Sequence, residues 1–173
     1  MYIDILILSH LIREPAHGYE IKKRVEGTFR GMIPLNNKLL YPALRRFEEQ
    51  GAVVSEVVHT QGRPDRSVYS LTSHGEELLR ELLRNYPLEL ALDDAEFLVR
   101  VAFFQFLDVP DRLRILQTRE TVMRDHLRYM TEGLETELEP EQQGGKQVIA
   151  FLRQQVEHEL VWITALMREQ GDR

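Results

Sequence analysis

Cysteine is absent from the 173 residues of this chain, and so is any long apolar run. The lack of cysteine excludes disulfide bonds, thiolate catalysis and cysteine-ligated zinc. A membrane-spanning helix needs about 18 consecutive apolar residues, and no stretch approaches that length. The apolar start, MYIDILILSHLI, has no basic region before it and is interrupted by Asp4 and His10, so we expect no signal peptide. We therefore expect a soluble, cytoplasmic protein with no membrane partner.

Patterns for catalysis and metal binding are missing as well. The six histidines contain no pair at a ligand spacing such as His-x-x-x-His. There is no Gly-rich phosphate loop, and no Ser-His-Asp set is suggested by position. We therefore expect no metal site, no cofactor and no enzymatic activity.

Positive charge is scarce overall, since the net charge is −6, but it is unevenly distributed. Residues 1–84 contain 12 basic and 11 acidic side chains, whereas the remaining residues contain 10 and 17. Residues 17–66 contain nine basic and six acidic side chains, so this segment has a local excess of positive charge. A locally positive surface can meet phosphates, while the acidic half would repel DNA and so help to orient its approach.

The first half of the chain predicts short helices followed by a hairpin of two strands. The expected elements are helices at about Ile3–Ile12, at Gly18–Thr28 and from Asn36 or Asn37 to Gln50, strands at Ala52–Val58 and Ser67–Leu71, and a helix from Ser73 to about Arg84. Asparagine favours the start of the third helix, Gly51 its end, and Ser73-His-Gly-Glu76 has capping-box spacing. This order is typical of a winged helix-turn-helix, which sets one helix in a DNA groove.

The second half predicts helices only. Asp93 or Asp94 is expected to cap an apolar helix, FLVRVAFFQFL, and Asp108 a long helix that continues past Met130. Glu139-Pro140 and Gly144-Gly145 indicate a loop before a last helix at about Lys146–Glu169. Its apolar seam needs a partner helix and consists of Ile149, Leu152, Val156, Leu160, Ile163 and Met167. The segment Asn85-Tyr-Pro87 is the expected boundary between a domain at 1–86 and a domain at 87–173.

Three blocks in order resemble the PadR family of bacterial transcriptional regulators: HGYEIKKRVE, LYPALRRFEEQG and GRPDRSVYSLTSHGEELL. The resemblance spans about residues 5–83. The helical remainder, with a late Glu159-x-x-Trp162, is similar to the longer PadR subfamily, whose C-terminal helical domain forms the dimer. The resemblance implies a mainly α fold, with a winged helix-turn-helix domain followed by an all-helical dimerisation and effector domain.

The resemblance also implies roles for individual residues. Tyr41 would lie on the recognition helix near a phosphate or base edge, Arg63 and Pro64 would shape the wing, and Tyr19 would stand near the DNA backbone. The expected DNA-contacting residues are Tyr19, Lys22, Asn36, Asn37, Lys38, Tyr41, Arg45, Arg63 and Arg66. An ordinary solvated face remains the alternative for Lys22 and its basic neighbours. Where the family often has Ser-Pro-Gly-Thr, this chain has Asn36-Asn37-Lys38-Leu39, which leaves the operator sequence open.

Aromatic residues of the second half allow two interpretations. Phe97, Phe103, Phe104 and Trp162 either pack a core and a dimer interface or line a pocket for a small aromatic effector. The first hypothesis for the whole chain is a ligand-responsive repressor that binds a near-palindromic double-stranded DNA operator as a homodimer. The alternative is a protein-interaction module that uses a winged-helix scaffold without specific DNA binding, which the acidic net charge would suit.

Overall fold

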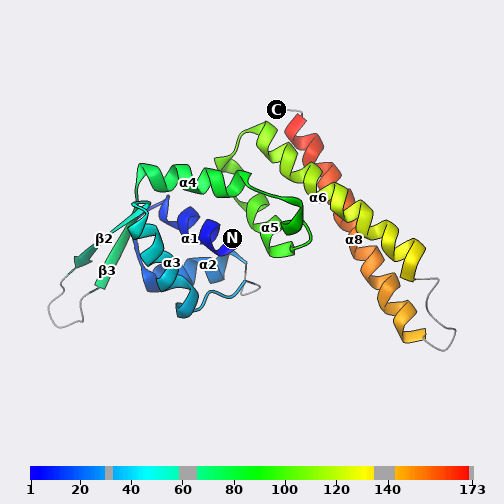
Figure 1. Cartoon of the computed structure of the whole chain (residues 1–173), viewed down its shortest axis with the longest axis horizontal. Coiled ribbons are helices and arrows are strands. Elements are labelled where there is room, and N and C mark those ends of the chain that lie inside the picture. The colour runs from blue at the N-terminus through cyan, green and yellow to red at the C-terminus, as the bar shows by residue number, and fades with distance from the viewer. Residues whose placement is uncertain (30–32, 59–65, 135–142, 172–173) are drawn as a thin grey trace. The chain divides into compact units, whose positions relative to one another are not determined.

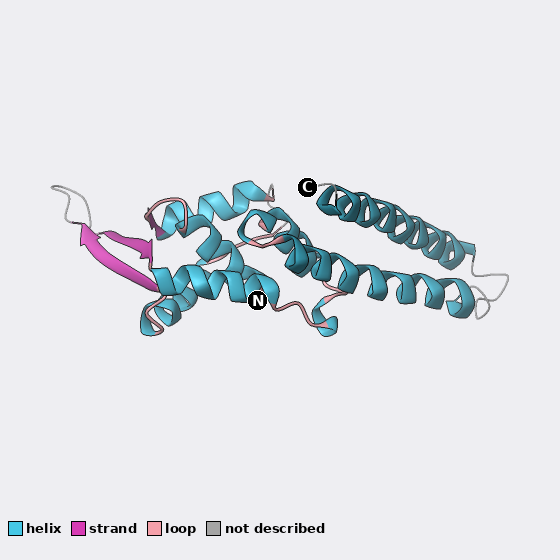
Figure 2. Ribbon diagram, turned by 90° about the horizontal axis from the view of Figure 1, so that it is seen from above, coloured by secondary structure: helices cyan, strands magenta, loops and turns pink. Residues whose placement is uncertain are grey.

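The computed structural model describes residues 1–29, 33–58, 66–134 and 143–171 (Figure 1). The described residues divide into two compact units. The first unit contains Met1–Asn85 and Leu98–Leu107, and the second contains Tyr86–Phe97 and Asp108–Arg173. The predicted fold class is confirmed, because a winged helix-turn-helix with a small antiparallel sheet precedes a segment built from helices (Figure 2).

Four helices form most of the first unit: α1 (Tyr2–Leu11), α2 (Gly18–Thr28), α3 (Asn37–Glu49) and α4 (Ser73–Arg84). The helix α1 lies at the centre, since every residue from Ile5 to Leu11 is buried. On α3 the apolar side chains of Leu40, Leu44 and Phe47 recur at helical spacing and are all buried. Burial of each such side chain stabilises the fold by roughly 1.5–3 kcal/mol, so this stripe fixes which face of α3 remains in solvent.

A three-stranded antiparallel sheet completes the first unit. Its strands are β1 (Ala16–His17), β2 (Val53–Val58) and β3 (Arg66–Leu71), in the order β1-β3-β2. The hairpin of β2 and β3 is the wing, with Val53 opposite Leu71 and Val58 opposite Arg66. Because His17 pairs with Val68, the start of α2 lies directly beside β3.

Local capping explains where α3 and α4 begin and end. The Asn36 Oδ1 atom accepts a hydrogen bond from the Leu39 N–H at 3.1 Å, and Gly51, with φ of 69°, follows the end of α3. The predicted cap of α4 was wrong by one residue. Thr72 is the cap, because its extended backbone lets its hydroxyl accept from the Gly75 N–H at 3.1 Å, whereas Ser73 is already helical.

The remaining elements are η1 (Leu88–Leu90), α5 (Asp94–Ala102), η2 (Phe104–Phe106), α6 (Val109–Tyr129), a π-helical turn η3 (Met130–Leu134) and α8 (Gln143–Gly171). The Asp93 carboxylate accepts from the backbone N–H groups of Ala95 and Glu96, which identifies Asp93 as the cap of α5. Asp108 caps α6 as predicted, by accepting from the Asp111 N–H at 2.9 Å. The apolar run predicted as one helix is interrupted, since α5 ends at Ala102 and a short 3₁₀ helix follows.

The helices α6 and α8 pack against each other in an antiparallel pair. Leu160 and Ile163 of the predicted seam are buried in this pair, with Ile115 and Leu116 of α6. The predicted loop was wrong at Gly144-Gly145, which lie inside α8, and Glu139-Pro140 lies outside the described residues. In the part of the chain that the structure describes, no helix is both long enough and apolar enough to cross a membrane.

Candidate nucleic-acid interface

The exposed face of α3 carries basic side chains opposite its buried stripe. With about 3.6 residues per turn, Lys38, Pro42 and Arg45 follow one another along the side of the helix that faces away from Leu40 and Leu44. All three are exposed. Within the described residues, neither Lys38 nor Arg45 has a carboxylate at ion-pair distance. Their charges are therefore available to an external anion.

Other basic side chains of the first unit are already paired with acids. The Arg46 guanidinium lies 2.5 Å from the Asp4 carboxylate, and the Arg24 guanidinium lies 2.6 Å from that of Glu14. The Lys22 ammonium, which the sequence placed among the DNA contacts, lies 3.8 Å from the Glu26 carboxylate one turn later. Charge that is compensated within the unit contributes less to attraction of phosphates.

A groove of about 840 Å³ opens beside α3. Three elements line it: the first turns of α2, the middle of α3 and the strand β3. The lining residues are His17, Gly18, Tyr19, Glu20, Lys23, Tyr41, Arg66, Ser67 and Tyr69. The lining therefore includes three phenol rings, two cationic side chains and one carboxylate. Among the described residues, Lys23 and Arg66 have no ion-pair partner either.

His17 fixes the start of α2 at the wall of this groove. Its backbone N–H donates to the Glu20 carboxylate at 2.9 Å, so Glu20 serves as a capping group. Its ring Nδ1 donates to the Ser67 carbonyl oxygen of β3 at 3.1 Å. A helix N-terminus presents backbone N–H groups and partial positive charge, which favours anions nearby.

The tyrosines of the groove differ in exposure. Tyr19 is 74% exposed and Tyr41 47%, whereas Tyr69 is half-buried. Burial raises the pKa of Tyr69, and the neighbouring Glu48 carboxylate and Tyr41 phenol raise it further, while a hydrogen bond with Ser67 lowers it. The Tyr69 hydroxyl is therefore protonated at neutral pH and can donate to an acceptor.

The structure brings together some of the predicted DNA contacts and separates others. Tyr19, Tyr41 and Arg66 line the large groove together. Arg45 lines a smaller groove of about 240 Å³ along α3, with Tyr41, Pro42, Arg46 and Glu49. Asn36, Asn37 and Lys38 are exposed at the start of α3, where the Asn36 side-chain oxygen is engaged in capping. Arg63 and Pro64 lie outside the described residues.

Sequence reasoning missed two members of the groove, Lys23 and Tyr69. Lys23 follows Tyr19 by four residues, which places both on one face of α2. Lys22 follows Tyr19 by three and satisfies the same rule, so spacing alone does not distinguish the two lysines. Tyr69 alternates with Ser67 on β3, so both reach the same side of the strand. Only the antiparallel pairing of β1 and β3 shows that this side meets the start of α2.

The four aromatic residues predicted for an effector or interface are divided between the two units. Phe103 and Phe104 belong to the first unit, where the Phe103 ring meets the ring of His10 edge-on at 6.1 Å. Phe97 and Trp162 belong to the second unit and contact each other, with ring centroids 6.0 Å apart. Phe97 is fully buried, whereas Trp162 is 38% exposed.

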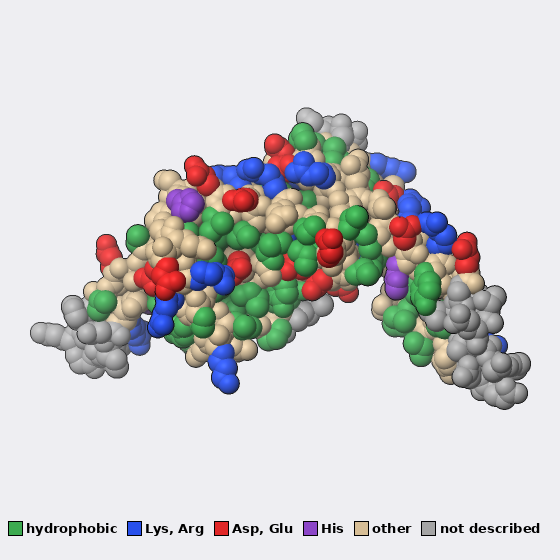
Figure 3. All heavy atoms as spheres, viewed as in Figure 1, with side chains coloured by type: hydrophobic (Ala, Val, Ile, Leu, Met, Phe, Trp, Pro, Cys, Tyr) green, Lys and Arg blue, Asp and Glu red, His purple; other side chains and the backbone are tan. Residues whose placement is uncertain are grey.

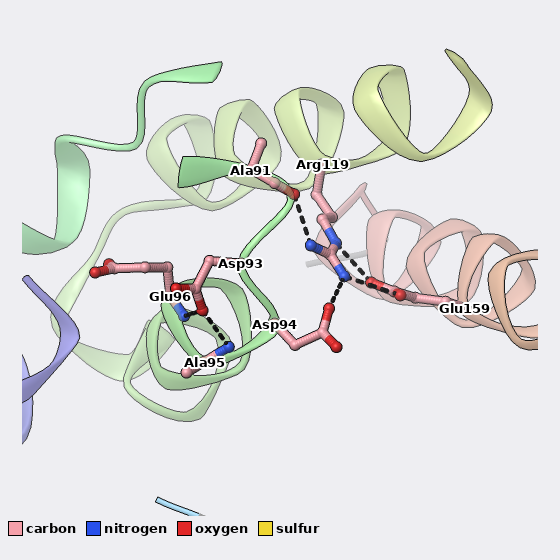
Figure 4. Close-up of polar contacts among 7 residues, drawn as sticks. All are labelled: Ala91, Asp93, Asp94, Ala95, Glu96, Arg119 and Glu159. Atoms are coloured by element: carbon pink, nitrogen blue, oxygen red, sulfur yellow. Dashed lines mark hydrogen bonds and ion pairs between the residues drawn. The ribbon is translucent and has the colours of Figure 1, made fainter. Parts of the chain in front are cut away.

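A buried arginine joins the helices of the second unit (Figure 4). Arg119 of α6 donates to the Glu159 carboxylate at 2.7 and 3.0 Å, to Asp94 at 2.6 Å and to the Ala91 carbonyl oxygen at 2.6 Å. Although burial would lower the pKa of Arg119, the hydrogen bonds with Glu159 and Asp94 raise it. Its guanidinium also lies 5.0 Å from the centre of the Phe97 ring. The two named residues of the Glu159-x-x-Trp162 motif therefore contact the same cluster, one through Arg119 and one through Phe97.

Comparison with known proteins matches the winged part of the chain. A family model described as the transcriptional regulator PadR-like family matches residues 7–81. A PadR family transcription regulator from Clostridium difficile is 35% identical, with 46% of this chain and 80% of that chain covered and a TM-score of 0.40. A PadR family transcriptional regulator from Eggerthella lenta is 38% identical, with 46% and 67% covered and a TM-score of 0.42. Bacillus subtilis PadR in complex with operator DNA is 17% identical, with 98% and 99% covered and a TM-score of 0.47. No curated protein matches the chain.

The matched residues include the groove and the exposed face of α3, together with the three sequence blocks that resemble the family. The winged helix-turn-helix of the structure agrees with that resemblance. The chain belongs to the PadR-like family, whose members are DNA-binding transcriptional regulators and not enzymes.

Proposed function

We propose that this protein regulates transcription in the cytoplasm by binding DNA through α3, the large groove and the wing. One observation carries the proposal. Lys38 and Arg45 on α3, and Lys23 and Arg66 in the groove, have no ion-pair partner among the described residues and lie around Tyr41 or on its helix. Neutralisation of phosphates by such cations releases counterions, which is the main source of affinity in many protein–DNA complexes.

Within this proposal α3 is the recognition helix. Its exposed side presents Lys38 and Arg45, which can donate to guanine or to phosphate, and Asn37, whose amide can pair with adenine. The groove beside it serves the DNA backbone, because the Tyr19 and Tyr41 hydroxyls and the start of α2 offer neutral donors next to two cations. Arg66 and Arg63 of the wing would bind phosphates that flank the bases contacted by α3.

The second unit supports a homodimer. On α8 the exposed side chains of Val148, Phe151 and Leu152 lie within one turn of each other, and Trp162 follows on nearly the same side about four turns from Val148. Leu152 belongs to the predicted seam, whereas Val148, Phe151 and Trp162 lie on another side of α8 than the buried Leu160 and Ile163. Apolar side chains, coloured green, lie at the surface of this unit in Figure 3. A second copy that covered this side would give two winged domains for a near-palindromic operator.

The proposal also includes a response to a small aromatic effector that binds in the second unit. The partly exposed Trp162 indole lies against the buried Phe97 ring, and Arg119 lies over that ring. A ligand stacked there would contact residues that join η1, α5, α6 and α8. If the ligand binds the DNA-free form more tightly, it lowers the affinity for DNA by the same factor, as expected of an inducer acting on a repressor.

The test is salt-dependent DNA binding by the full-length protein. Fluorescence anisotropy would be measured on a duplex that the protein selects from a random-sequence library and on an unselected duplex. Lys23→Ala and Arg66→Ala should each lower the slope of log affinity against log salt by about 0.9. Arg80→Ala is the charge-matched control, because Arg80 on α4 is already paired with Glu76 at 3.2 Å. Absence of saturable, salt-dependent binding by the unaltered protein would favour the protein-interaction module instead.

A further inference from the structure

The glycine at the start of α2 lies in contact with Tyr41. Gly18 is the first residue of α2, directly after the capping residue His17, and it is buried. A Cβ atom added at Gly18 would lie 3.0 Å from both the Cε1 and the Oη atoms of Tyr41, and 3.2 Å from its Cζ atom. Ordinary van der Waals contact begins at about 3.4 Å, so the phenol ring occupies space that only glycine leaves free.

The contact involves the ring of Tyr41 rather than the backbone of α3, so a larger residue at position 18 would displace the ring and not the helix. Tyr41 is 47% exposed, so it can rotate into solvent without disturbing the buried stripe of α3. A methyl group at position 18 would therefore displace the phenol at little cost in stability. What changes is the position of its hydroxyl relative to Lys23 and Arg66 in the groove.

We infer that Gly18 is a positioning residue for DNA binding, because the absence of a side chain there allows the Tyr41 hydroxyl to lie against the first turn of α2. The inference rests on the proposed function and makes it more specific. One backbone phosphate would accept from the Tyr41 hydroxyl at the α2 N-terminus, with Lys23 and Arg66 near it in the same groove. A contact held in place before binding loses less conformational entropy on association than one made by a freely rotating side chain.

The helix α2 supplies its own matched control. Gly27 lies near the other end of the same helix, and a Cβ atom there would meet no heavy atom within 4 Å. Gly27→Ala and Gly18→Ala make the same chemical change in the same element, but only the second change reaches Tyr41. Comparison of the two variants separates the effect on Tyr41 from a general effect of alanine on the helix.

The experiment measures affinity for the selected duplex by anisotropy with the full-length protein. We expect Tyr41→Ala to weaken binding by on the order of tenfold, the loss typical of a hydrogen bond to a charged acceptor. Gly18→Ala should weaken binding several-fold and Gly18→Val should approach the loss in Tyr41→Ala, whereas Gly27→Ala should not change affinity. Since none of these variants removes a positive charge, none should change the salt slope, which distinguishes them from Lys23→Ala.

A double-mutant cycle decides whether Gly18 acts through Tyr41. In the Tyr41→Ala background, Gly18→Ala should have no further effect on affinity. An equal loss in both backgrounds would overturn the inference, because Gly18 would then act on DNA by another route. Unchanged affinity in both Gly18→Ala and Gly18→Val would overturn it too.

Thermal unfolding monitored by circular dichroism shows whether a variant loses DNA affinity because it no longer folds. If Gly18→Ala unfolds the domain and Tyr41→Ala restores it, the steric contact is supported directly. If the double variant remains unfolded, the methyl group clashes elsewhere and the inference is refuted. Failure of the unaltered protein to bind any duplex would refute the proposed function, and this outcome is distinct from every outcome that concerns Gly18 alone.

Discussion

A buried histidine in the first unit makes its stability depend on pH. His10 of α1 is 8% exposed, and its Nε2 atom lies 3.1 Å from the Thr28 Oγ1 atom. The Thr28 hydroxyl donates to the Arg24 carbonyl oxygen at 3.0 Å, so it accepts from a neutral imidazole that is protonated at Nε2. Burial, together with the positive charges of Arg13 and Arg24, lowers the pKa of His10 to about 4.

The magnitude follows from the difference between the folded and unfolded pKa values. The unfolded chain binds a proton at His10 below pH 6.5, whereas the folded chain does so only below about pH 4. The contribution of His10 to the free energy of unfolding is therefore fully present above pH 6.5 and is lost as the pH falls toward 4. At 1.36 kcal/mol per pKa unit, the full loss is about 3 kcal/mol, of which about 2 kcal/mol is lost by pH 5.

Urea denaturation at pH 8, 6.5, 5 and 4 measures this loss, with circular dichroism as the signal. Carboxylates also contribute to acid denaturation, so the informative quantity is the difference between the unaltered protein and His10→Gln. Glutamine can still donate to Thr28 but does not titrate. The difference in unfolding free energy should change by about 2 kcal/mol between pH 8 and pH 5. His74→Gln, at an exposed histidine in the first turn of α4, should give no comparable change. Parallel pH profiles of the unaltered protein and His10→Gln would refute the reasoning.

Three further predictions concern other contacts. Arg119→Met should lower the unfolding free energy of the second unit by about 3 kcal/mol in urea followed by Trp162 fluorescence, because two carboxylates lose a buried partner. Arg124→Met, at an exposed i,i+4 pair on the same helix, should cost less than about 1 kcal/mol, and similar losses would contradict the importance of the cluster. Gly75→Ala should cost about 2 kcal/mol or more, because a Cβ atom there would lie 2.1 Å from the Ala52 carbonyl oxygen, whereas Gly144→Ala, with open space around it, should be tolerated. Phe151→Glu should convert a dimer to a monomer in sizing with light scattering, while Gln117→Glu at an exposed position of α6 should not, and a monomeric unaltered protein would refute the dimer.

Local signals in the sequence predicted much of the fold. The second helix has the predicted bounds, and the stripe of Leu40, Leu44 and Phe47 identified the buried side of α3. Asn36 and Gly51 marked its two ends, because capping depends on groups only a few residues apart. The same is true of Asp108 at the start of α6. These features depend on neighbours within about one helical turn, which is why the order of residues is enough to find them.

Errors and omissions arose where distant residues decide the outcome. Thr72 replaced Ser73 as a cap partly because its hydroxyl also donates to the Gly51 carbonyl oxygen, 21 residues away. Arg119 was not recognised because its partner Glu159 is 40 residues distant. The glycines at 144 and 145 indicated a loop, but they lie in the first turn of a 29-residue helix, whose many good helix formers outweigh the low helix propensity of glycine. The groove itself depends on the pairing of His17 with Val68, which no local pattern predicts.

The acidic net charge is a poor guide to whether this chain can bind DNA. At physiological salt the Debye length is about 8 Å, so exposed acidic side chains further away than this are largely screened from a bound phosphate. What remains is the charge within a few ångströms of the DNA, and this depends on which cations are already paired. Arg46, Arg24 and Lys22 have carboxylate partners, whereas Lys38 and Arg45 on α3 and Lys23 and Arg66 in the groove have none among the described residues. A count of charges in the sequence does not distinguish these two groups of cations, whereas the ion pairs of the folded structure do. Removal of an unpaired cation should therefore lower the salt slope, and removal of a paired one should not.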